Sequence, residues 1–313
     1  MSCVKVVTLG VHVLDVLVRP VESIPEGQGG AIVDEIRMAP AGTAGGTAVT
    51  LAKLGAEVHS AGAIGNDPVG DVLLRLLAGF GIDTTNLVRR DGVQTSASVL
   101  PIRPDGSRPA FHVVGANGTY TSADAPNDVI AGATHLHVGG PEFMGGDDAA
   151  KVLAFAREHG VVTSADLLAP GEQLADLVDW VAPIFAHLDY FLPNDEQVLA
   201  LTGASTVPAG CAALVDRGVG CVAATVGADG AVVATAAGVE QVPAFTVDVV
   251  DTTGCGDAFS AGFLRGLSLG RSPRDAAVLG CAVASLVAQG LGSDHGDFDL
   301  AAAESIVSTG LTG

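Results

Sequence analysis

Apolar residues in this chain follow two alternating patterns. Short continuous apolar runs, such as residues 222–226 and 231–235, are typical of strands that are buried on both faces. Longer segments have the spacing of helices, and the clearest of them, residues 273–288, has Ser272 as its N-cap and Pro273 at its first position. From about residue 135 the two patterns alternate regularly, which predicts a parallel sheet covered by helices on both faces.

The same patterns place the individual elements. They predict strands near residues 5–9, 15–18, 31–38, 58–64, 95–102, 109–114, 134–138, 161–165, 190–192, 221–226 and 231–234. They predict helices near residues 48–54, 67–79, 147–158, 174–181, 195–201, 207–216, 258–269 and 273–288, and a weak helix in the tail after residue 296.

Three predicted strands do not fit the alternation around them. These are residues 31–38, 95–102 and 109–114. The last two are joined by residues 103–107, Arg-Pro-Asp-Gly-Ser, which form a strong hairpin turn signal. We therefore predict a small separate sheet beside the main one.

Composition narrows the classes of function. The chain has 313 residues, enough for a full α/β domain, and although 48% of them are apolar, the sequence has no continuous apolar run long enough to span a membrane. The net charge of −20 argues against nucleic acid and anionic membranes as partners. It does not exclude ATP, which backbone N–H groups and a metal ion can hold. The N-terminus reads as a strand without a signal-peptide cleavage pattern, so we expect a cytoplasmic protein.

Cysteines and histidines indicate no metal site. The five cysteines form no Cys-x-x-Cys pair, and scattered single cysteines suit a reducing compartment. Cys255 stands at a predicted helix start, which would lower the pKa of its thiol; we prefer the alternative, a small residue that fits the loop. His135 and His137 alternate on one strand without a facing acidic pair, and we interpret them as structural.

The most informative segment is residues 251–259, Asp-Thr-Thr-Gly-Cys-Gly-Asp-Ala-Phe. It follows an apolar stretch, residues 247–250, that reads as the end of a strand, and it leads into a predicted helix. Glycines let backbone N–H groups converge and a helix start adds positive potential, so this loop would hold a phosphate. Asp257 beside a phosphate would serve to take a proton from an attacking hydroxyl. The alternative is a tight turn in which Asp257 only complements the helix dipole.

The longer run Asp-Thr-Thr-Gly-Cys-Gly-Asp-Ala-Phe-Ser-Ala-Gly-Phe resembles the C-terminal signature of the ribokinase family of sugar and nucleoside kinases, also called the phosphofructokinase B family. The resemblance implies a ribokinase-like α/β fold, in which a doubly wound, mostly parallel sheet is flanked by helices and capped by a small β-sheet lid. The chain would be one kinase domain, residues 1–313, with a lid formed by about residues 12–40 and 94–118. Family members often dimerise through their lids, which would cover the exposed sheet face.

The resemblance also implies an activity. The protein would phosphorylate a primary hydroxyl of a sugar with ATP, and Mg²⁺ would bridge the phosphates. Asp257 would be the catalytic base. The backbone N–H groups of Gly254, Cys255 and Gly256 would form the anion hole for the transferred phosphoryl group.

Further residues follow other predicted strands and could converge on the same cleft, because ligands of open parallel sheets bind beyond the carboxyl ends of the strands. Residues 41–48 resemble the family's N-terminal signature, whose glycines let sugar hydroxyls approach the backbone. Ala41 replaces the first glycine of that signature, and Gly46 replaces an asparagine that contacts sugar hydroxyls, which would leave room for a bulkier substrate. The predicted substrate-binding residues are Asp15, Gly42, Gly45, Gly46 and Glu142.

Other segments resemble the nucleotide side of the family. Residues 192–197, Leu-Pro-Asn-Asp-Glu-Gln, resemble a motif that organises magnesium and phosphate through water; Gln197 stands at its glutamate, and Glu196 is the candidate substitute. Residues 225–230 resemble a nucleotide-side turn, and residues 284–292 a segment that closes over adenine. The predicted ATP-binding residues are Asn194, Thr225, Gly227, Gly230 and Gly292. The family also has a loop that binds a monovalent cation. Asp251 and Thr253, together with Gly292, resemble that loop, which would suit potassium.

Several alternatives remain at this point. A nucleoside kinase would carry the same motifs, and a sugar- or nucleotide-binding regulator could keep the fold, although it would have no use for Asp257. A dinucleotide-dependent oxidoreductase needs Gly-x-Gly-x-x-Gly after the first strand, which residues 10–15 lack. Arg103 and Arg108 flank the predicted hairpin turn and are expected to be solvated, with contact to a substrate as the alternative.

Overall fold

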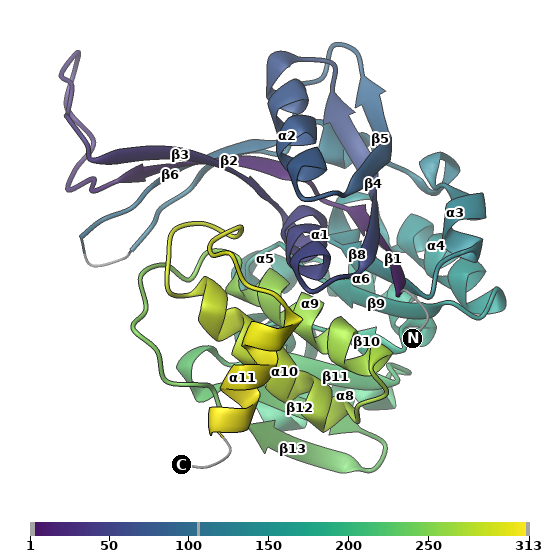
Figure 1. Ribbon diagram of the computed structural model, residues 1–313. Helices are drawn as coiled ribbons and strands as arrows, with labels where there is room; N and C mark the ends of the chain where they lie inside the picture. Colours follow the sequence, from purple (N-terminus) through teal and green to yellow (C-terminus); the bar gives the residue numbers. More distant parts are fainter. Residues whose placement is uncertain (1–3, 105–106, 311–313) are drawn as a thin grey trace.

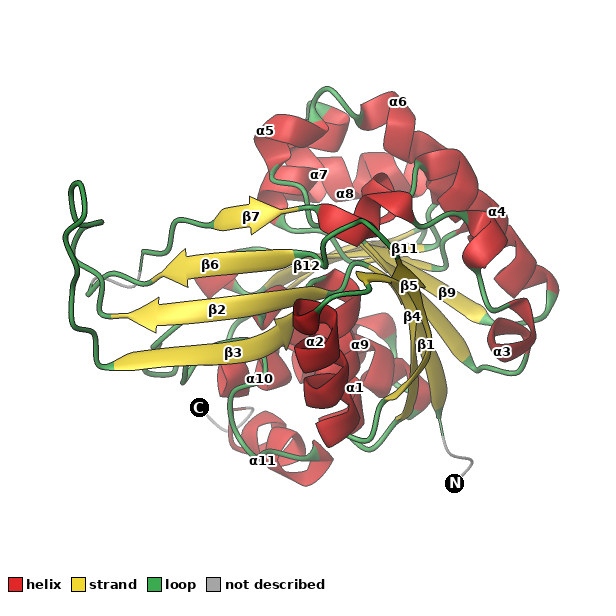
Figure 2. Ribbon diagram, turned by 90° about the horizontal axis from the view of Figure 1, so that it is seen from above, coloured by secondary structure: helices red, strands yellow, loops and turns green. Residues whose placement is uncertain are grey.

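The computed structural model describes residues 4–104 and 107–310 and contains two sheets of different size (Figures 1 and 2). The larger sheet has nine strands in the order β13-β12-β11-β10-β9-β8-β1-β4-β5, and the smaller has four in the order β3-β2-β6-β7. The strands are β1 (Lys5–Gly10), β2 (Val13–Arg19), β3 (Glu35–Ala41), β4 (Glu57–Gly65), β5 (Asp83–Arg90), β6 (Ala97–Pro101), β7 (Phe111–Val113), β8 (His135–Gly139), β9 (Val162–Asp166), β10 (Tyr190–Phe191), β11 (Cys221–Thr225), β12 (Ala231–Thr235) and β13 (Gly238–Val242).

Helices cover both faces of the larger sheet. The helices are α1 (Thr43–Lys53), α2 (Pro68–Gly79), α3 (Asn127–Ala131), α4 (Gly146–Glu158), α5 (Gly171–Leu174), α6 (Val178–Val181), α7 (Asp195–Thr202), α8 (Val207–Asp216), α9 (Cys255–Ser268), α10 (Pro273–Val287) and α11 (Leu300–Gly310). Neighbouring strands from β11 to β5 pair in parallel, while β12 and β13 pair antiparallel at one end. Side chains of a strand alternate between faces, so Val6 packs in one apolar cluster with α1, α9 and α10, and Val7 in another with α4 and α8.

The smaller sheet projects from the body of the molecule (Figure 2). Its inner face carries Asp15 and a buried apolar cluster that includes Leu17, Ala39 and Leu100. Met38 and Val99 alternate with these residues and are exposed on the outer face. The predicted small sheet is therefore present, with β6 and β7 paired antiparallel as expected of a hairpin.

Some predicted boundaries were wrong. Residues 31–34 are not part of a strand, and residues 247–250, expected to end one, are not a strand either. The helix expected at 48–54 begins at Thr43, so Gly45 and Gly46 lie inside it, and the helix expected at 258–269 begins at Cys255. The segment 174–181 is split into the short helices α5 and α6. Asp105 and Gly106, the centre of the predicted turn, lie outside the described residues; on either side of them the Arg103 N–H donates to the Ser107 carbonyl oxygen at 2.9 Å.

A helix that spans a membrane must be both long and apolar. Within residues 4–104 and 107–310, no single helix is long and apolar enough to cross a bilayer. The bent pair α7 and α8, whose axes differ by 58°, meets that test only by its combined length and composition.

Candidate active site

The candidate site lies at the carboxyl ends of the parallel strands, beneath the inner face of the smaller sheet. Asp257 stands in the first turn of α9, and Asp15 lies on β2, which follows the end of β1. Burial and then the charge of Asp15 raise the pKa of Asp257, so the two carboxyl groups, far apart in the sequence, lie close enough to interact in the fold. The fold therefore brings these two predicted site residues near each other.

Gly46 lies directly against Asp257. A Cβ atom at position 46 would lie 2.2 Å from Asp257 Oδ2 and 3.0 Å from Asp257 Cβ. Thr47 adds a hydrogen bond from its Oγ1 to the carbonyl oxygen of Asp257 at 3.4 Å. The absence of a side chain at position 46 therefore makes room for the carboxylate of Asp257 rather than for a bulkier substrate.

Burial and neighbouring charge raise the pKa values of Asp15 and Asp257. Burial and then the charge of Asp15 raise the pKa of Asp257 to about 8, and the charge of Arg108 opposes the shift. Burial raises the pKa of Asp15 to about 6, against a hydrogen bond from Ser98 and the charge of Arg108. The site thus holds an unusual carboxyl group that titrates near neutral pH, which is typical of functional positions.

Asp166 is a further carboxyl group that the sequence analysis did not single out. It ends β9, is buried, and accepts hydrogen bonds from the Leu167 N–H at 2.7 Å and from Ser260 Oγ at 3.4 Å. Burial, followed by the charges of Asp257 and Glu142, raises its pKa well above the usual range. The available signal was an aspartate at the carboxyl end of a buried parallel strand.

Glu142 follows β8 in the short 3₁₀ turn Pro141–Phe143. Its Oε1 accepts hydrogen bonds from the backbone N–H groups of Leu168 at 2.7 Å and Ala169 at 2.8 Å, which fixes the loop after β9. Burial raises the pKa of this carboxyl group. Oε2 is buried and has no hydrogen-bond partner among the described residues, so Glu142 keeps one oxygen for another group.

The glycine-rich loop before α9 differs in packing from one glycine to the next. Gly254 is the N-cap of α9 with a φ of 77°, and a Cβ there would lie 2.3 Å from Ser293 Cβ, so only glycine fits. Open space surrounds the position that a Cβ of Gly256 would take. The Cys255 N–H donates to the Thr252 carbonyl oxygen at 3.2 Å, which leaves Gly254 and Gly256 as the better placed donors. Burial raises the pKa of the Cys255 thiol to about 12, so it outweighs the lowering expected from the helix start.

Asp251 organises the beginning of this loop. Its Oδ1 accepts hydrogen bonds from the Thr253 N–H at 2.9 Å and Thr253 Oγ1 at 2.7 Å, and its Oδ2 accepts from the Gly292 N–H at 3.0 Å. Arg108 Nε lies 3.4 Å from Oδ1, so the expectation that Arg108 is solvated was wrong. These residues do not fit potassium as they stand, because both carboxylate oxygens are engaged and a guanidinium already supplies the positive charge.

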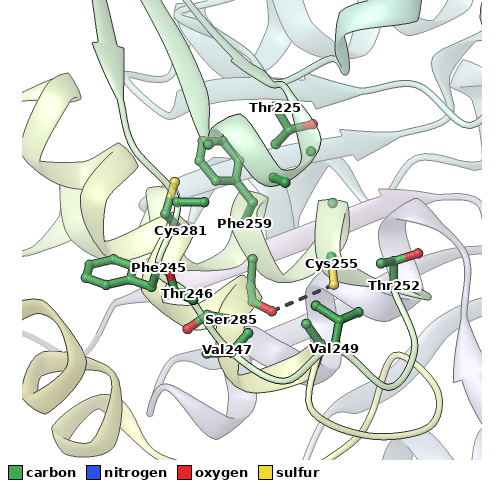
Figure 3. A pocket seen from close by; sticks show the side chains of 17 residues that line it. Thr225, Phe245, Thr246, Val247, Val249, Thr252, Cys255, Phe259, Cys281 and Ser285 are labelled. Carbon is green, nitrogen blue, oxygen red and sulfur yellow. Dashed lines mark hydrogen bonds between the residues drawn. The ribbon is translucent and has the colours of Figure 1, made fainter. Parts of the chain in front are cut away.

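A pocket of about 430 Å³ opens beside this loop (Figure 3). Figure 3 shows side chains of α9, α10 and the segment 245–252 around it, among them Phe245 and Phe259, which the sequence analysis did not single out. The predicted residues Thr225, Gly227, Gly230, Cys255 and Gly256 line it, together with Ala284, Ser285 and Ala288. Asn194 and Gly292 are not among the lining residues, although Asn194 pairs with Thr225 through a β-bridge. The mostly apolar wall of this pocket, with Gly256 among its lining residues, suits a flat base attached to phosphates.

Comparison with known proteins assigns the chain to a family of enzymes. Residues 5–297 match the model of the pfkB family carbohydrate kinase. The chain belongs to this family. The predicted ribokinase-like class is confirmed, and the protein is an ATP-dependent phosphotransferase that acts on a sugar hydroxyl.

Individual relatives of this carbohydrate kinase cover most of its length. It is 32% identical over 261 residues to the ATP-dependent ribose-1-phosphate kinase of Halopiger xanaduensis, covering 83% of this chain and 84% of that protein. It is 30% identical over 270 residues to the 2-dehydro-3-deoxygluconokinase of Bacillus subtilis, covering 82% of each. Its fold is similar to that of Arabidopsis thaliana ribokinase complexed with ribose and ATP, with a TM-score of 0.83 at 21% identity, covering 98% of this chain and 99% of that one.

In this kinase Gln197 has a structural task. Its Oε1 accepts a hydrogen bond from the Asn194 N–H, and its Nε2 donates to the carbonyl oxygens of Leu167 and Ala169, each at 3.0 Å. The Asn194 side chain caps α7 in return. All hydrogen-bonding atoms of the Gln197 amide are thus occupied, and Glu196, the candidate substitute, is exposed and is not among the residues that line the pocket.

Proposed function

We propose that Asp257 is the general base of this kinase and that the loop 251–257 binds the transferred phosphoryl group. The observation that carries the proposal is the position of Asp257, a partly buried carboxyl group with a pKa of about 8 that directly follows the pocket-lining Gly256 and is influenced by the charge of Asp15. In this assignment the hydroxyl oxygen of the sugar attacks the γ-phosphorus while Asp257 takes the hydroxyl proton. The bond to the β-phosphate oxygen breaks, and ADP leaves. Backbone N–H groups of Gly254 and Gly256 stabilise the charge on the transferred group.

The acceptor proposed here is a sugar whose hydroxyls contact the inner face of the small sheet. Asp15, held by Ser98, would accept hydrogen bonds from two hydroxyls, and the free Oε2 of Glu142 would accept another. Gly42 has a φ of 87° and is half-buried, so its backbone would be presented to the sugar, whereas Gly45 is buried inside α1 against His12 and would not contact it. Free sugars, sugar acids and sugar phosphates are all substrates to test, because the relatives above include kinases of a sugar phosphate and of a sugar acid.

Magnesium enters the proposal as the partner of the nucleotide. No group of three or more His, Cys, Asp or Glu residues within the described ranges could hold a metal ion, so the protein offers no closed cage. Magnesium would therefore be held mainly by phosphate oxygens and water. A bound magnesium ion would neutralise part of the phosphate charge. A structure of an E. coli protein assigned as ribokinase II contains both ATP and Mg²⁺.

A coupled assay of ADP release across pentoses, hexoses, sugar acids, sugar phosphates and nucleosides tests the proposal. We expect turnover with at least one sugar-class acceptor at a rate well above that of ATP hydrolysis without acceptor. Turnover confined to nucleosides would replace the sugar assignment with a nucleoside kinase. Nucleotide binding without turnover of any acceptor would favour a regulator.

The pH dependence of kcat/KM should report the titration of Asp257. A base must be deprotonated, so kcat/KM should rise about tenfold per pH unit below the pKa of about 8 and level off above it. Asp15→Asn should move this limb to lower pH because it removes a charge that raises the pKa of Asp257. Arg108→Gln should move the limb to higher pH because it removes a charge that lowers that pKa. A profile that is flat between about pH 5.5 and 8 would contradict Asp257 as the base.

We also propose that two copies associate through the outer face of the small sheet. That face exposes Ile36, Met38, Val99 and Phe111, and apolar patches of this kind are covered in stable proteins. Sedimentation should give about twice the chain mass of 31.1 kDa for the wild type and the chain mass for Met38→Glu. Val239→Glu, at an exposed position of β13, is the matched control. A monomeric wild type would contradict the proposal.

A further inference from the structure

Arg108 connects the small sheet to the anion loop. It lies in the segment between β6 and β7, and its Nε stands 3.4 Å from Oδ1 of Asp251. Asp251 is buried, and the same carboxylate fixes Thr253 and Gly292 by hydrogen bonds. The side chain of Arg108 therefore joins the small sheet, which would contact the sugar, to Asp251, the first residue of the loop 251–257.

The charge of Arg108 reaches both halves of the cleft. It opposes the rise that burial causes in the pKa of Asp15, on the acceptor side, and of Asp257, in the first turn of α9. It likewise opposes the effect of burial on the pKa of the Cys255 thiol, which lies at the edge of the nucleotide pocket. The guanidinium is thus placed where the acceptor side and the phosphate loop meet, among carboxyl groups that would otherwise repel a triphosphate.

The geometry of the guanidinium leaves donors for a ligand. An arginine has five N–H donors in a planar fork. Nε of Arg108 lies 3.4 Å from Asp251 Oδ1, and within the described residues no hydrogen bond from its two Nη groups is found. About a third of the side chain remains exposed, so Arg108 is accessible to a ligand. A planar pair of donors matches two oxygens of a phosphoryl group.

We propose that Arg108 binds the transferring phosphoryl group through its Nη atoms while Asp251 holds its Nε. This inference rests on the proposed function and adds a catalytic residue to it. Arg108 takes no proton: the hydroxyl proton goes to Asp257, the acceptor oxygen–phosphorus bond forms, and the bond to ADP breaks. The contribution of Arg108 is to offset charge that spreads over the phosphoryl oxygens in the transition state.

Nucleotide binding separates this role from others without requiring turnover. ADP lacks the γ-phosphoryl group, so titration calorimetry with ADP and with a non-hydrolysable ATP analogue, both with Mg²⁺, isolates contact with that group. For Arg108→Gln we expect the analogue to bind about tenfold more weakly and ADP to bind as in the wild type, with kcat lower by about 10²–10³-fold. Arg108→Lys keeps the charge without the fork and should recover part of kcat.

Arg103→Gln is the matched control, because Arg103 lies in the same segment, is exposed, and bonds to Ser107. It should leave both affinities and kcat unchanged, and thermal unfolding should show that every variant is folded. Equal weakening of ADP and the analogue, or none, in an otherwise active enzyme would overturn the role of Arg108 alone. A rise in KM for anionic acceptors only would also overturn it, in favour of an acceptor subsite. A wild type that binds no nucleotide would overturn the proposed function itself.

Discussion

Asp257→Asn should abolish most of the turnover while leaving both substrates bound. The amide has nearly the shape of the carboxylate but cannot take a proton, and general-base catalysis contributes about 10²–10⁴-fold to kcat. Removing a carboxylate that lies beside the triphosphate should not weaken the binding of ATP, because the carboxylate and the phosphates repel each other. We therefore expect kcat to fall by about 10²–10⁴-fold, with the dissociation constant of ADP within about threefold of the wild type.

A matched control exists in another helix start. Asp275 occupies the first turn of α10, as Asp257 does in α9, but it is exposed and lies away from the candidate site. Asp275→Asn removes the same charge from an equivalent helix position and should leave kcat unchanged. If Asp257→Asn were as active as this control, Asp257 would only complement the helix dipole.

Local signals in the sequence were sufficient for the elements that carry the site. The helix expected at residues 207–216 has those bounds in the structure, because the Thr206 side chain caps it and Pro208 stands in its first turn, where no backbone N–H is needed. The loop and helix around residue 257 were also predicted from glycines and apolar spacing, although residues 247–250 before them are not a strand and α9 begins three residues earlier than expected. Strands β5 and β13 were missed because they are edge strands with many polar and exposed residues, so they lack the continuous apolar run of a buried strand.

The contacts that set the chemistry could not be read from local signals. Arg108 and Asp251 are distant in sequence, and nothing near either residue indicates that they form an ion pair. The same holds for Asp166, whose pKa is raised by burial and by the charge of Asp257 from another element. Spacing within a segment predicts which residues share a face, whereas these contacts depend on how the small sheet and the β9 end meet α9.

Gln197 stands where the resembled motif has a glutamate, and its hydrogen bonds explain the difference. The two carbonyl oxygens of Leu167 and Ala169 need donors, and the amide Nε2 of Gln197 supplies both. A glutamate would place a carboxylate against two acceptors inside a buried site, which is unfavourable. In this chain residue 197 therefore holds the loop after β9, next to Glu142, and leaves the phosphates to other groups.

Gly46→Asn, which restores the asparagine of the resembled signature, should lower kcat rather than improve it. The new Cβ would lie 2.2 Å from Asp257 Oδ2, so the carboxylate must move away from its present position. A displacement of about 1 Å at a reacting group can cost about 10²-fold in rate, and we expect a loss of that size in kcat with any accepted sugar. Gly46→Ala introduces the same Cβ without a polar group and should show most of the effect.

Gly79→Ala provides the comparison, because Gly79 is also helical and a Cβ there would meet nothing within 4 Å. Replacing a helical glycine by alanine stabilises by about 0.5–1 kcal/mol when no clash follows, so Gly79→Ala should unfold at a higher temperature and keep its kcat. Gly46→Ala should lack that gain, since the same preference is offset by the clash with Asp257. Should Gly46→Asn instead match or exceed the wild-type kcat, the carboxylate of Asp257 would not depend on the space at position 46. The departure from the signature would then be neutral for catalysis.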